Sequence, residues 1–399
     1  MPVVASSLLD KCWRFAAEQR AVEESGYYPF FPAIRACDGP TACMGDRRVV
    51  MAGSSDYLGL THHRHVVERA RAAVTRYGSS VTGSRLLNGT LDLHVELEER
   101  LARFLRRPAV LLFPSGYQAQ LGAVTTLVGK KDEIFCDRHN HASLVDGCRL
   151  SRSVFKRYRH GSVTDLARLL EQSDRGKAKL IVTDGVFSMD GDLAPLPGIL
   201  ECARAHDALT LVDDAHGLGV IGSSGRGTIE VLGVEGAIDI LTGSLSKTLA
   251  SIGGFVAADH HIIDYVKHHA RPFVFTGSLP ASAVAAASAA LDIVEREPER
   301  RTRLVELTRR VVAGLSDLGF HLGVAAAPIV PVFLGGWMKA LTLFRALLRE
   351  GVYVNPVIPP AVPPGRSMLR VCLMATHTDQ HADAIIGAFD RAGCALEEL

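Results

Sequence analysis

Short apolar runs alternate with longer stretches of helical periodicity through the middle of the chain. The runs Ala109–Phe113, Lys179–Asp184 and Ala208–Asp213 are apolar almost throughout, and helical patterns at 163–172 and 197–206 precede the last two. Three further strands and one helix are predicted in this region, at 133–136, 154–156, 238–243 and 117–128. A strand that is apolar at every position is buried on both faces. The pattern therefore predicts an α/β fold with a mostly parallel sheet covered by helices.

The two ends of the chain show different patterns. Residues 6–24 have the periodicity of an amphipathic helix, and a Gly/Tyr/Pro turn then leads into an irregular stretch that runs to about Asp46. A helix at 281–295 leads into a second alternating region. We expect that region to form a small α+β domain from three helices and two strands, at 300–317, 338–349, 377–392, 329–333 and 369–373.

Length, charge and cysteine usage narrow the class of protein. A chain of 399 residues is too long for one simple core, so two or three packed subdomains are expected. The net charge of +1 argues against a nucleic-acid or anionic-membrane surface. The eight cysteines lack CxxC spacing and indicate reduced thiols. Asp10 and Lys11 interrupt any signal-peptide core, and no run is long enough to span a membrane. These features predict a cytoplasmic enzyme with at most peripheral membrane contact.

Lys247 stands among small, hydroxylated and apolar residues. The flanking sequences ILTGSL and IGGFVA have a buried composition, and Lys247 follows the strand predicted at 238–243. A lysine at a strand end can extend its ammonium group to water past an apolar stem. A desolvated lysine has a nucleophilic amine at neutral pH and can form a Schiff base. This segment alone leaves both interpretations open.

The motif Asp213-Asp214-Ala215-His216 directly follows a predicted strand and favours the Schiff-base interpretation. An aspartate at a strand end can pair with a protonated pyridine nitrogen, as it does in sites for pyridoxal 5'-phosphate (PLP). His216 can reach the phenolic oxygen of the same ring. A metal pair or a helix cap is the alternative, but no third metal ligand stands nearby. Lys247, Asp213 and His216 together predict a PLP site.

A turn of small residues opens the helix predicted after strand Ala109–Phe113. Backbone N–H groups of Ser115, Gly116 and Tyr117 would lie at the helix start, where phosphate binds well, and Ser244 would add a hydroxyl group. A plain strand-to-helix turn is the alternative. No GxGxxG or GxxxxGK[ST] motif occurs in it, so it has no signature of a dinucleotide or nucleoside-triphosphate site.

Two further residues are candidates with a less specific pattern. His141 follows the strand at 133–136 and can stack on a flat ring or transfer a proton, with a purely structural histidine as the alternative. Arg370 suits bidentate binding of an amino-acid carboxylate, with a strand-edge ion pair as the alternative. The segment Asp190–Asp192 is similar to part of a calcium loop, but the remaining ligands are missing. No metal site is therefore expected.

A dense set of motifs between Tyr57 and Thr378 resembles the α-oxoamine synthase family of fold-type I PLP enzymes. The motifs are DYLGL (56–60), GSSVTGSRLLNGT (78–90), SGYQA (115–119), NHASLVDG (140–147), DGVFSMDGD (184–192), VDDAHGLGV (212–220), LSK (245–247), FTGSLP (275–280) and ATHT (375–378). The resemblance implies a seven-stranded, mostly parallel sheet in a large PLP-binding domain. The domains would be an N-terminal helix and arm (1–55), the large domain (56–290) and a small α+β domain (291–399).

The resemblance also implies a role for each candidate residue. Lys247 would carry the cofactor, His141 would stack on its ring, Asp213 would pair with the ring nitrogen and His216 with the phenolic oxygen. Ser188 would lie beside the ring. The phosphate would be held by a set of small and hydroxylated residues, namely Ser115, Gly116, Tyr117, Ser244 and, from the partner subunit of a homodimer, Thr276. Arg370 and Ser55 would contact the amino-acid substrate.

The reaction implied by the resemblance is a decarboxylative Claisen condensation of a small amino acid with an acyl thioester. The segments at 26–31 and 351–365 are similar to the branch that uses serine and a long acyl chain. Ile358 and Ser55 depart from related patterns, so alanine and glycine stay open, as do coenzyme A and acyl carrier protein. The rival interpretations are a PLP aminotransferase or lyase, and a catalytically silent partner subunit.

Overall fold

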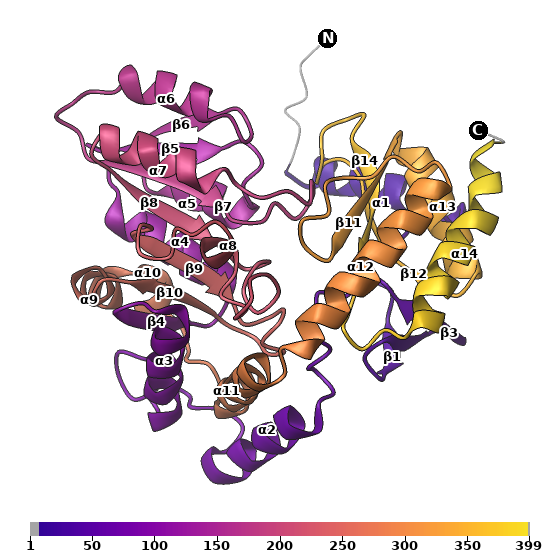
Figure 1. Cartoon of the computed structure of the whole chain (residues 1–399), viewed down its shortest axis with the longest axis horizontal. Coiled ribbons are helices and arrows are strands. Elements are labelled where there is room, and N and C mark those ends of the chain that lie inside the picture. The colour runs from indigo at the N-terminus through magenta and orange to yellow at the C-terminus, as the bar shows by residue number, and fades with distance from the viewer. Residues whose placement is uncertain (1–7, 398–399) are drawn as a thin grey trace.

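The computed structural model describes residues 8–397, with side chains to Gly393, and contains two bodies joined by long helices (Figure 1). The larger body is built on a seven-stranded sheet with helices on both faces. The smaller body contains two short sheets covered by α12 (Glu299–Asp317), α13 (Trp337–Arg349) and α14 (Asp379–Glu397). The large body corresponds to the α/β pattern of the sequence, and the small body to the second alternating region.

The central sheet has the order β4-β10-β9-β8-β7-β5-β6. Its strands are β4 (Ala109–Phe113), β5 (Glu133–Asp137), β6 (Val154–Tyr158), β7 (Lys179–Asp184), β8 (Ala208–Asp213), β9 (Ile240–Ser244) and β10 (Gly254–Ala258). Only β10 runs antiparallel to its neighbours. The carboxyl ends of the other six strands therefore meet at one edge, where ligands bind in open α/β sheets. The predicted fold, a seven-stranded and mostly parallel sheet covered by helices, is confirmed.

Helices cover both faces of this sheet. Those of the large body are α3 (Asp92–Leu105), α4 (Gly116–Leu127), α5 (Ala142–Leu150), α6 (Val163–Glu171), α7 (Leu196–Ala205), α8 (Thr228–Val231), α9 (His260–His269) and α10 (Arg271–Val274). Strands β5, β7, β9 and β10 are buried at every position, whereas β6 at the sheet edge is partly exposed. Packing against the helices on both faces explains why β7 and β9 tolerate no exposed side chain.

Strand β10 was not predicted. The segment Gly254–Ala258 follows a loop rather than a helix, so the strand–helix–strand pattern that located its neighbours does not apply to it. It turns back between β4 and β9 and packs closely on the start of α4: a Cβ at Gly254 would lie 2.4 Å from Gly116 Cα. Glycine is therefore required where this strand passes the functional edge of the sheet.

The expectation of an irregular stretch to about Asp46 is wrong. Residues of this stretch form β1 (Ile34–Cys37) and β2 (Thr41–Met44), which continue into β3 (Arg47–Met51) as an antiparallel sheet. The fourth strand of that sheet is β12 (Val352–Tyr353), which pairs in parallel with β3. All four side chains of β1 are exposed, so the segment has no alternating pattern by which to recognise a strand. The N-terminal strands thus complete the small body.

The second small sheet and the connecting helices set the position of the two bodies. The sheet has the order β11-β14-β13, from Ile329–Gly335, Ser367–Cys372 and Asn355–Val357. Helices α2 (Arg64–Tyr77) and α11 (Ala281–Arg296) pack side by side, and α11 leads into α12.

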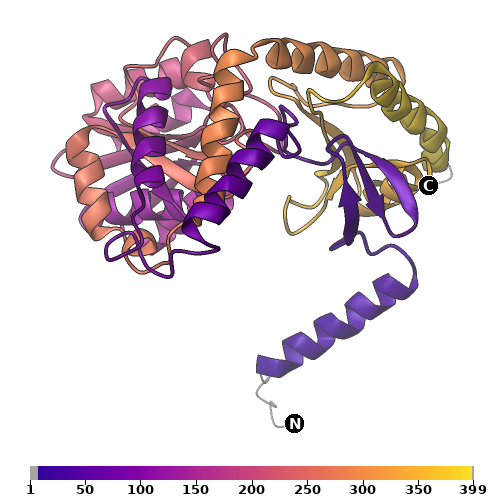
Figure 2. The same ribbon diagram turned by 90° about the horizontal axis from the view of Figure 1, so that it is seen from below.

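Helix α1 (Leu8–Glu24) extends away from the strands that follow it and buries no residue (Figure 2). Between residues 8 and 397, no helix is both long and apolar enough to cross a membrane.

Candidate active site

The strand ends at the functional edge of the sheet enclose a pocket of about 280 Å³. Its lining contains nine of the ten residues that the sequence placed at the cofactor: Ser115, Gly116, Tyr117, His141, Ser188, Asp213, His216, Ser244 and Lys247. They lie at or just beyond the carboxyl ends of β4, β5, β7, β8 and β9. Residues spread over the sequence are gathered here because parallel strands end on one side.

One end of the pocket is formed by the N-terminus of α4. Ser115 caps this helix by accepting a hydrogen bond from Gln118 N at 3.1 Å, and Gly116 begins it. The Ser244 and Ser246 hydroxyls lie 2.6 Å apart beside it, and a Cβ at Gly116 would lie only 3.1 Å from Ser244 Cβ. Helix-start N–H groups and hydroxyl groups together form a cradle suited to a phosphate.

Lys247 and Asp213 line the same pocket and influence each other electrostatically. Burial lowers the pKa of Lys247, while the charges of Asp213 and Asp184 oppose that shift. Burial likewise raises the pKa of Asp213, and the Lys247 charge opposes this. A lysine whose pKa is lowered carries an unprotonated, nucleophilic amine more often than an exposed lysine does.

His216 is held by a residue whose role the sequence did not reveal. The Tyr57 hydroxyl lies 2.7 Å from His216 Nδ1, and Tyr57 is completely buried. Burial raises the pKa of Tyr57, so the phenol keeps its proton and donates to Nδ1. Burial and the Lys247 charge lower the pKa of His216 well below its ordinary value. The ring is therefore neutral, with its proton on Nε2 as a hydrogen-bond donor.

His141 lines the pocket and is anchored on both sides. Its backbone N–H donates to Asp184 Oδ2 at 2.9 Å, and its Nδ1 lies 2.6 Å from Ser143 Oγ. Burial lowers the pKa of the ring, and the Lys247 and Arg370 charges act in the same direction against the Asp213 charge. Ser143 Oγ also donates to Gln120 Oε1, and Gln120 Nε2 donates to Asp213 Oδ2. A continuous hydrogen-bond chain therefore links His141 to Asp213.

Arg370, Ser55 and Thr276 lie outside the pocket lining. The Arg370 charge nevertheless lowers the pKa of His141, His216 and Lys247, which places its guanidinium group close to them. Ser55 donates a hydrogen bond to Tyr57 that lowers the pKa of the phenol. Thr276 borders a separate small cleft beside Pro114 in its own chain. The predicted role of Thr276 concerns a second subunit, so that role stays a prediction.

Four residues of the site carried no recognised signal in the sequence. Gln120 and Ser143 lie within helices, Tyr57 and Ser246 in loops, and each acts through a neighbour rather than at a strand end. Tyr57 belongs to the motif DYLGL, Ser143 to NHASLVDG and Ser246 to LSK, whereas Gln120 directly follows SGYQA. Their available sign was a polar group in a segment expected to be buried, since a buried polar group needs a partner.

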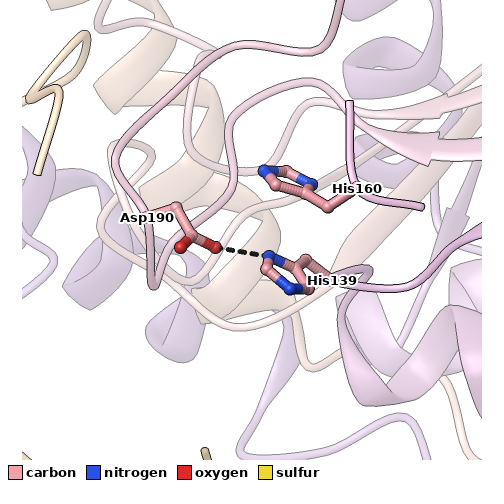
Figure 3. Close-up of side chains that lie close together, drawn as sticks. All are labelled: His139, His160 and Asp190. Atoms are coloured by element: carbon pink, nitrogen blue, oxygen red, sulfur yellow. Dashed lines mark hydrogen bonds and ion pairs between the residues drawn. The ribbon is translucent and has the colours of Figure 1, made fainter. Parts of the chain in front are cut away.

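His139, His160 and Asp190 form a second cluster of side chains (Figure 3). His160 bonds Asp137 through Nδ1 and Asp192 through Nε2, both at 3.0 Å, and stacks on His139 at 4.1 Å between ring centroids. Burial alone would lower its pKa, but these two hydrogen bonds raise it to about 10. His160 is therefore a charged bridge between carboxylates, and neither of its nitrogens has a lone pair directed at a cation.

The matches to known proteins agree with this geometry. A model of the family "Aminotransferase class I and II" matches residues 47–389, and this chain belongs to that family. Within the family it belongs to the α-oxoamine synthases, so the predicted resemblance is confirmed. It is 41% identical to a serine palmitoyltransferase of Bacteroides thetaiotaomicron, over 98% of this chain and 99% of that protein.

Two further matches show the same relationship. The chain is 44% identical to 8-amino-7-oxononanoate synthase of Geobacter sulfurreducens, over 95% of this chain and 97% of that protein. A solved structure of a serine palmitoyltransferase variant from S. paucimobilis with bound PLP and myriocin superposes with a TM-score of 0.96. That match has 36% identity and covers 99% of this chain and 100% of the other.

Proposed function

We propose that this chain is a PLP-dependent C-acyltransferase that condenses a small amino acid, preferably L-serine, with a long-chain acyl thioester. The products would be an α-amino ketone, CO2 and the free thiol. The observation that carries the proposal is the gathering of Lys247, Asp213 and His216 with the N-terminus of α4 around one pocket. Full-length relatives named serine palmitoyltransferase support the choice of reaction.

The residues of the pocket fit PLP. The N-terminus of α4 with Ser244 and Ser246 would hold the phosphate, and Lys247 Nζ would be the point of attachment. Asp213 would pair with the ring nitrogen, and His216, with its proton on Nε2, would donate to the phenolic oxygen. The buried oxygen Asp184 Oδ1 has no hydrogen-bond partner in the described part of the chain, as expected beside a binding pocket.

When bound, PLP accepts the electron pair left on the amino-acid Cα when a bond to that atom breaks. Once the amino group of the substrate has taken its place, the freed amine of Lys247 would remove the Cα proton, since its lowered pKa leaves it unprotonated more readily. The Cα then attacks the thioester carbonyl and the thiol leaves. Loss of CO2 and return of a proton to Cα complete the reaction. The partly buried walls of the pocket position the Cα bond that breaks.

Arg370 is proposed to hold the amino-acid carboxylate. Its Nε is buried without a hydrogen-bond partner among the described residues, although it lies on β14 close to the reacting groups. A buried, unpaired guanidinium N–H is costly unless a ligand occupies it. Ser55 and Tyr57, which adjoin His216, would form the neighbouring wall for the substrate side chain.

The test is thiol release by the purified protein with PLP and palmitoyl-CoA, compared for L-serine, L-alanine and glycine. The product is identified by mass spectrometry. Release with L-serine and an α-amino ketone of matching mass would support the proposal, and Lys247→Ala should abolish both. Turnover retained by Lys247→Ala would contradict it, as would amino-group transfer to a keto acid without thiol release.

The second candidate is a synthase that uses alanine and another acyl thioester. The relative from Geobacter sulfurreducens, named 8-amino-7-oxononanoate synthase, favours it. Thiol release with L-alanine, or with an acyl carrier protein and not with coenzyme A, would select this candidate within the same reaction class. The acyl carrier is thus decided by the same assay.

We also propose that the working form is a homodimer in which Thr276 of each subunit completes the other's phosphate site. The loops 82–90 and 275–279 lie together, since Ser278 N donates to Gly83 O at 2.9 Å. They expose the large apolar side chains of Leu86, Leu87 and Phe275 beside the cleft that Thr276 borders. A group of exposed apolar side chains next to a binding site is typical of a subunit interface.

A further inference from the structure

The hydrogen-bond chain between Asp213 and His141 runs through two side chains that are removed from water. Gln120 is 3% exposed and Ser143 is completely buried. Gln120 Nε2 donates to Asp213 Oδ2, Ser143 Oγ donates to Gln120 Oε1, and His141 Nδ1 lies 2.6 Å from Ser143 Oγ. No water is needed to connect the two residues, so the orientation of each link constrains the next.

The donor and acceptor of each hydrogen bond in this chain follow from the carboxylate of Asp213. An ionised Asp213 only accepts hydrogen bonds, so the amide NH2 of Gln120 must face it. The amide oxygen of Gln120 then faces Ser143 and only accepts, so the single hydroxyl proton of Ser143 is used there. The remaining bond to Ser143 Oγ must be donated by His141 Nδ1. The chain therefore assigns the His141 proton to Nδ1.

One contact opposes this assignment. The backbone N–H of Ser143 lies 3.3 Å from His141 Nδ1 and would require that nitrogen to accept. The hydroxyl contact is much shorter and belongs to a chain that ends on a carboxylate, so it has the larger electrostatic energy. Because burial keeps the ring neutral, Nε2 then keeps its lone pair, opposite to the protonation of His216.

We propose that Gln120 and Ser143 are positioning residues that hold His141 in the Nδ1–H tautomer and fix the carboxylate of Asp213. The inference rests on the proposed function in one respect, namely that His141 and Asp213 flank the cofactor. His141 thereby presents a hydrogen-bond acceptor to the pocket, and His216 presents a donor. A change in the charge of Asp213 is transmitted to His141 without a direct contact between them.

The direct test is the tautomer of His141 in full-length protein labelled with nitrogen-15 histidine, with and without added PLP. Two-bond proton–nitrogen correlation spectra distinguish Nδ1–H from Nε2–H, and His141→Gln assigns the signal. We expect Nδ1–H in the wild type and a shift toward the Nε2–H tautomer of free imidazole in Gln120→Leu. An Nε2–H tautomer in the wild type, or an unchanged spectrum in Gln120→Leu, would overturn the inference.

Ser143→Ala interrupts the same chain at a smaller side chain and should give the same spectrum as Gln120→Leu, so the test does not depend on the folding of one variant. Gln172→Leu, at the end of α6 and away from the pocket, is the matched control and should leave the signal unchanged. Since the spectrum needs no substrate, the inference can fail while the proposed reaction stands, and the reverse also holds.

An isosteric variant supplies the pH dependence that a packing role would not produce. A protonated carboxyl group in Gln120→Glu can donate to Asp213 and accept from Ser143, whereas an ionised one cannot donate at all. We expect this variant to resemble the wild type at acidic pH and Gln120→Leu at alkaline pH. In turnover at alkaline pH, kcat of Gln120→Glu should fall about tenfold or more with KM little changed, because neither Gln120 nor Ser143 touches a substrate group. An equal loss at every pH would show a packing role instead.

Discussion

At the scale of single residues, the pocket contains two neighbouring carboxyl groups whose charges repel each other. Asp184 and Asp213 are direct neighbours on β7 and β8, and both are buried. Burial and the charge of Asp213 raise the pKa of Asp184 well above its ordinary value. Asp213 is favoured as the charged member because the Lys247 charge lies close to it and Gln120 donates to it. Burial and the neighbouring charge therefore disfavour ionisation of Asp184 more than that of Asp213.

The first prediction compares two isosteric substitutions. Asp184→Asn puts a neutral amide in place of the carboxyl group whose ionisation is disfavoured, and should keep turnover within about threefold. Asp213→Asn removes the charge proposed to pair with the ring nitrogen and should lower kcat by about a hundredfold or more. Thiol release measures both. Equal losses in the two variants would contradict this division of charge.

The site residues that were predictable are those that directly follow strands. Lys247, Asp213 and His216 each stand after an apolar run, where the topology of a parallel sheet requires a ligand edge. Gln120 and Tyr57 were missed because their partners are distant in sequence: Asp213 for one and His216 for the other. Only the packed fold brings such pairs together, and a lone glutamine in a helix has no pattern of its own.

At the scale of elements, the ends of β5, β6 and β7 are joined through a histidine. His160 follows β6 and bridges Asp137 at the end of β5 to Asp192 beyond β7. Arg366, on the loop before β14, adds an ion pair to Asp190 at 2.5 Å. This group therefore ties three strand ends of the large body to a loop of the small one.

The second prediction concerns the pH dependence of stability. The pKa of His160 is raised from an ordinary 6.5 to about 10, so its stabilising contribution is complete below pH 6.5 and is lost as pH rises toward 10. The unfolding free energy should fall across that window by at most about 1.4 kcal/mol per pH unit. Urea unfolding at a series of pH values measures this, and the unfolding free energy of His160→Gln should fall less steeply with pH than that of the wild type. The matched control His206→Gln, at the end of α7, should keep the wild-type slope, and an unchanged slope in His160→Gln would refute the prediction.

Element positions were predictable where helices and strands alternate. The bounds of β4, β7 and β8 agree with their apolar runs, and α11 and α12 begin within a residue of the predicted start. Strands β1 and β10 were missed for physical reasons that differ. All side chains of β1 are exposed, whereas β10 is buried but enters the sheet in the opposite direction. Neither gives the periodicity on which a sequence-based assignment depends.

At the scale of the whole molecule, the proposed homodimer leads to the third prediction. Phe275 is 73% exposed in the single chain and adjoins Thr276, so Phe275→Asp should yield monomers with weakened PLP affinity. Val324 in the small body is 72% exposed and provides the matched control Val324→Asp, which should remain dimeric. Light scattering after gel filtration measures the mass. A dimeric Phe275→Asp with normal PLP affinity would argue against this interface.

The pairing of β3 with β12 has a consequence for folding during synthesis on the ribosome. The first three strands leave the ribosome early, but their fourth strand is among the last segments to be made. The seven-stranded sheet, which ends with β10, is complete long before that, so we expect it to fold first. In ribosome-bound chains that stop short of residue 352, a protease should cut β1–β3 while the central sheet resists. Until β12 is made, the edge of β3 has no partner strand. To avoid aggregation over that interval, the early strands depend on a chaperone or on rapid completion of the chain.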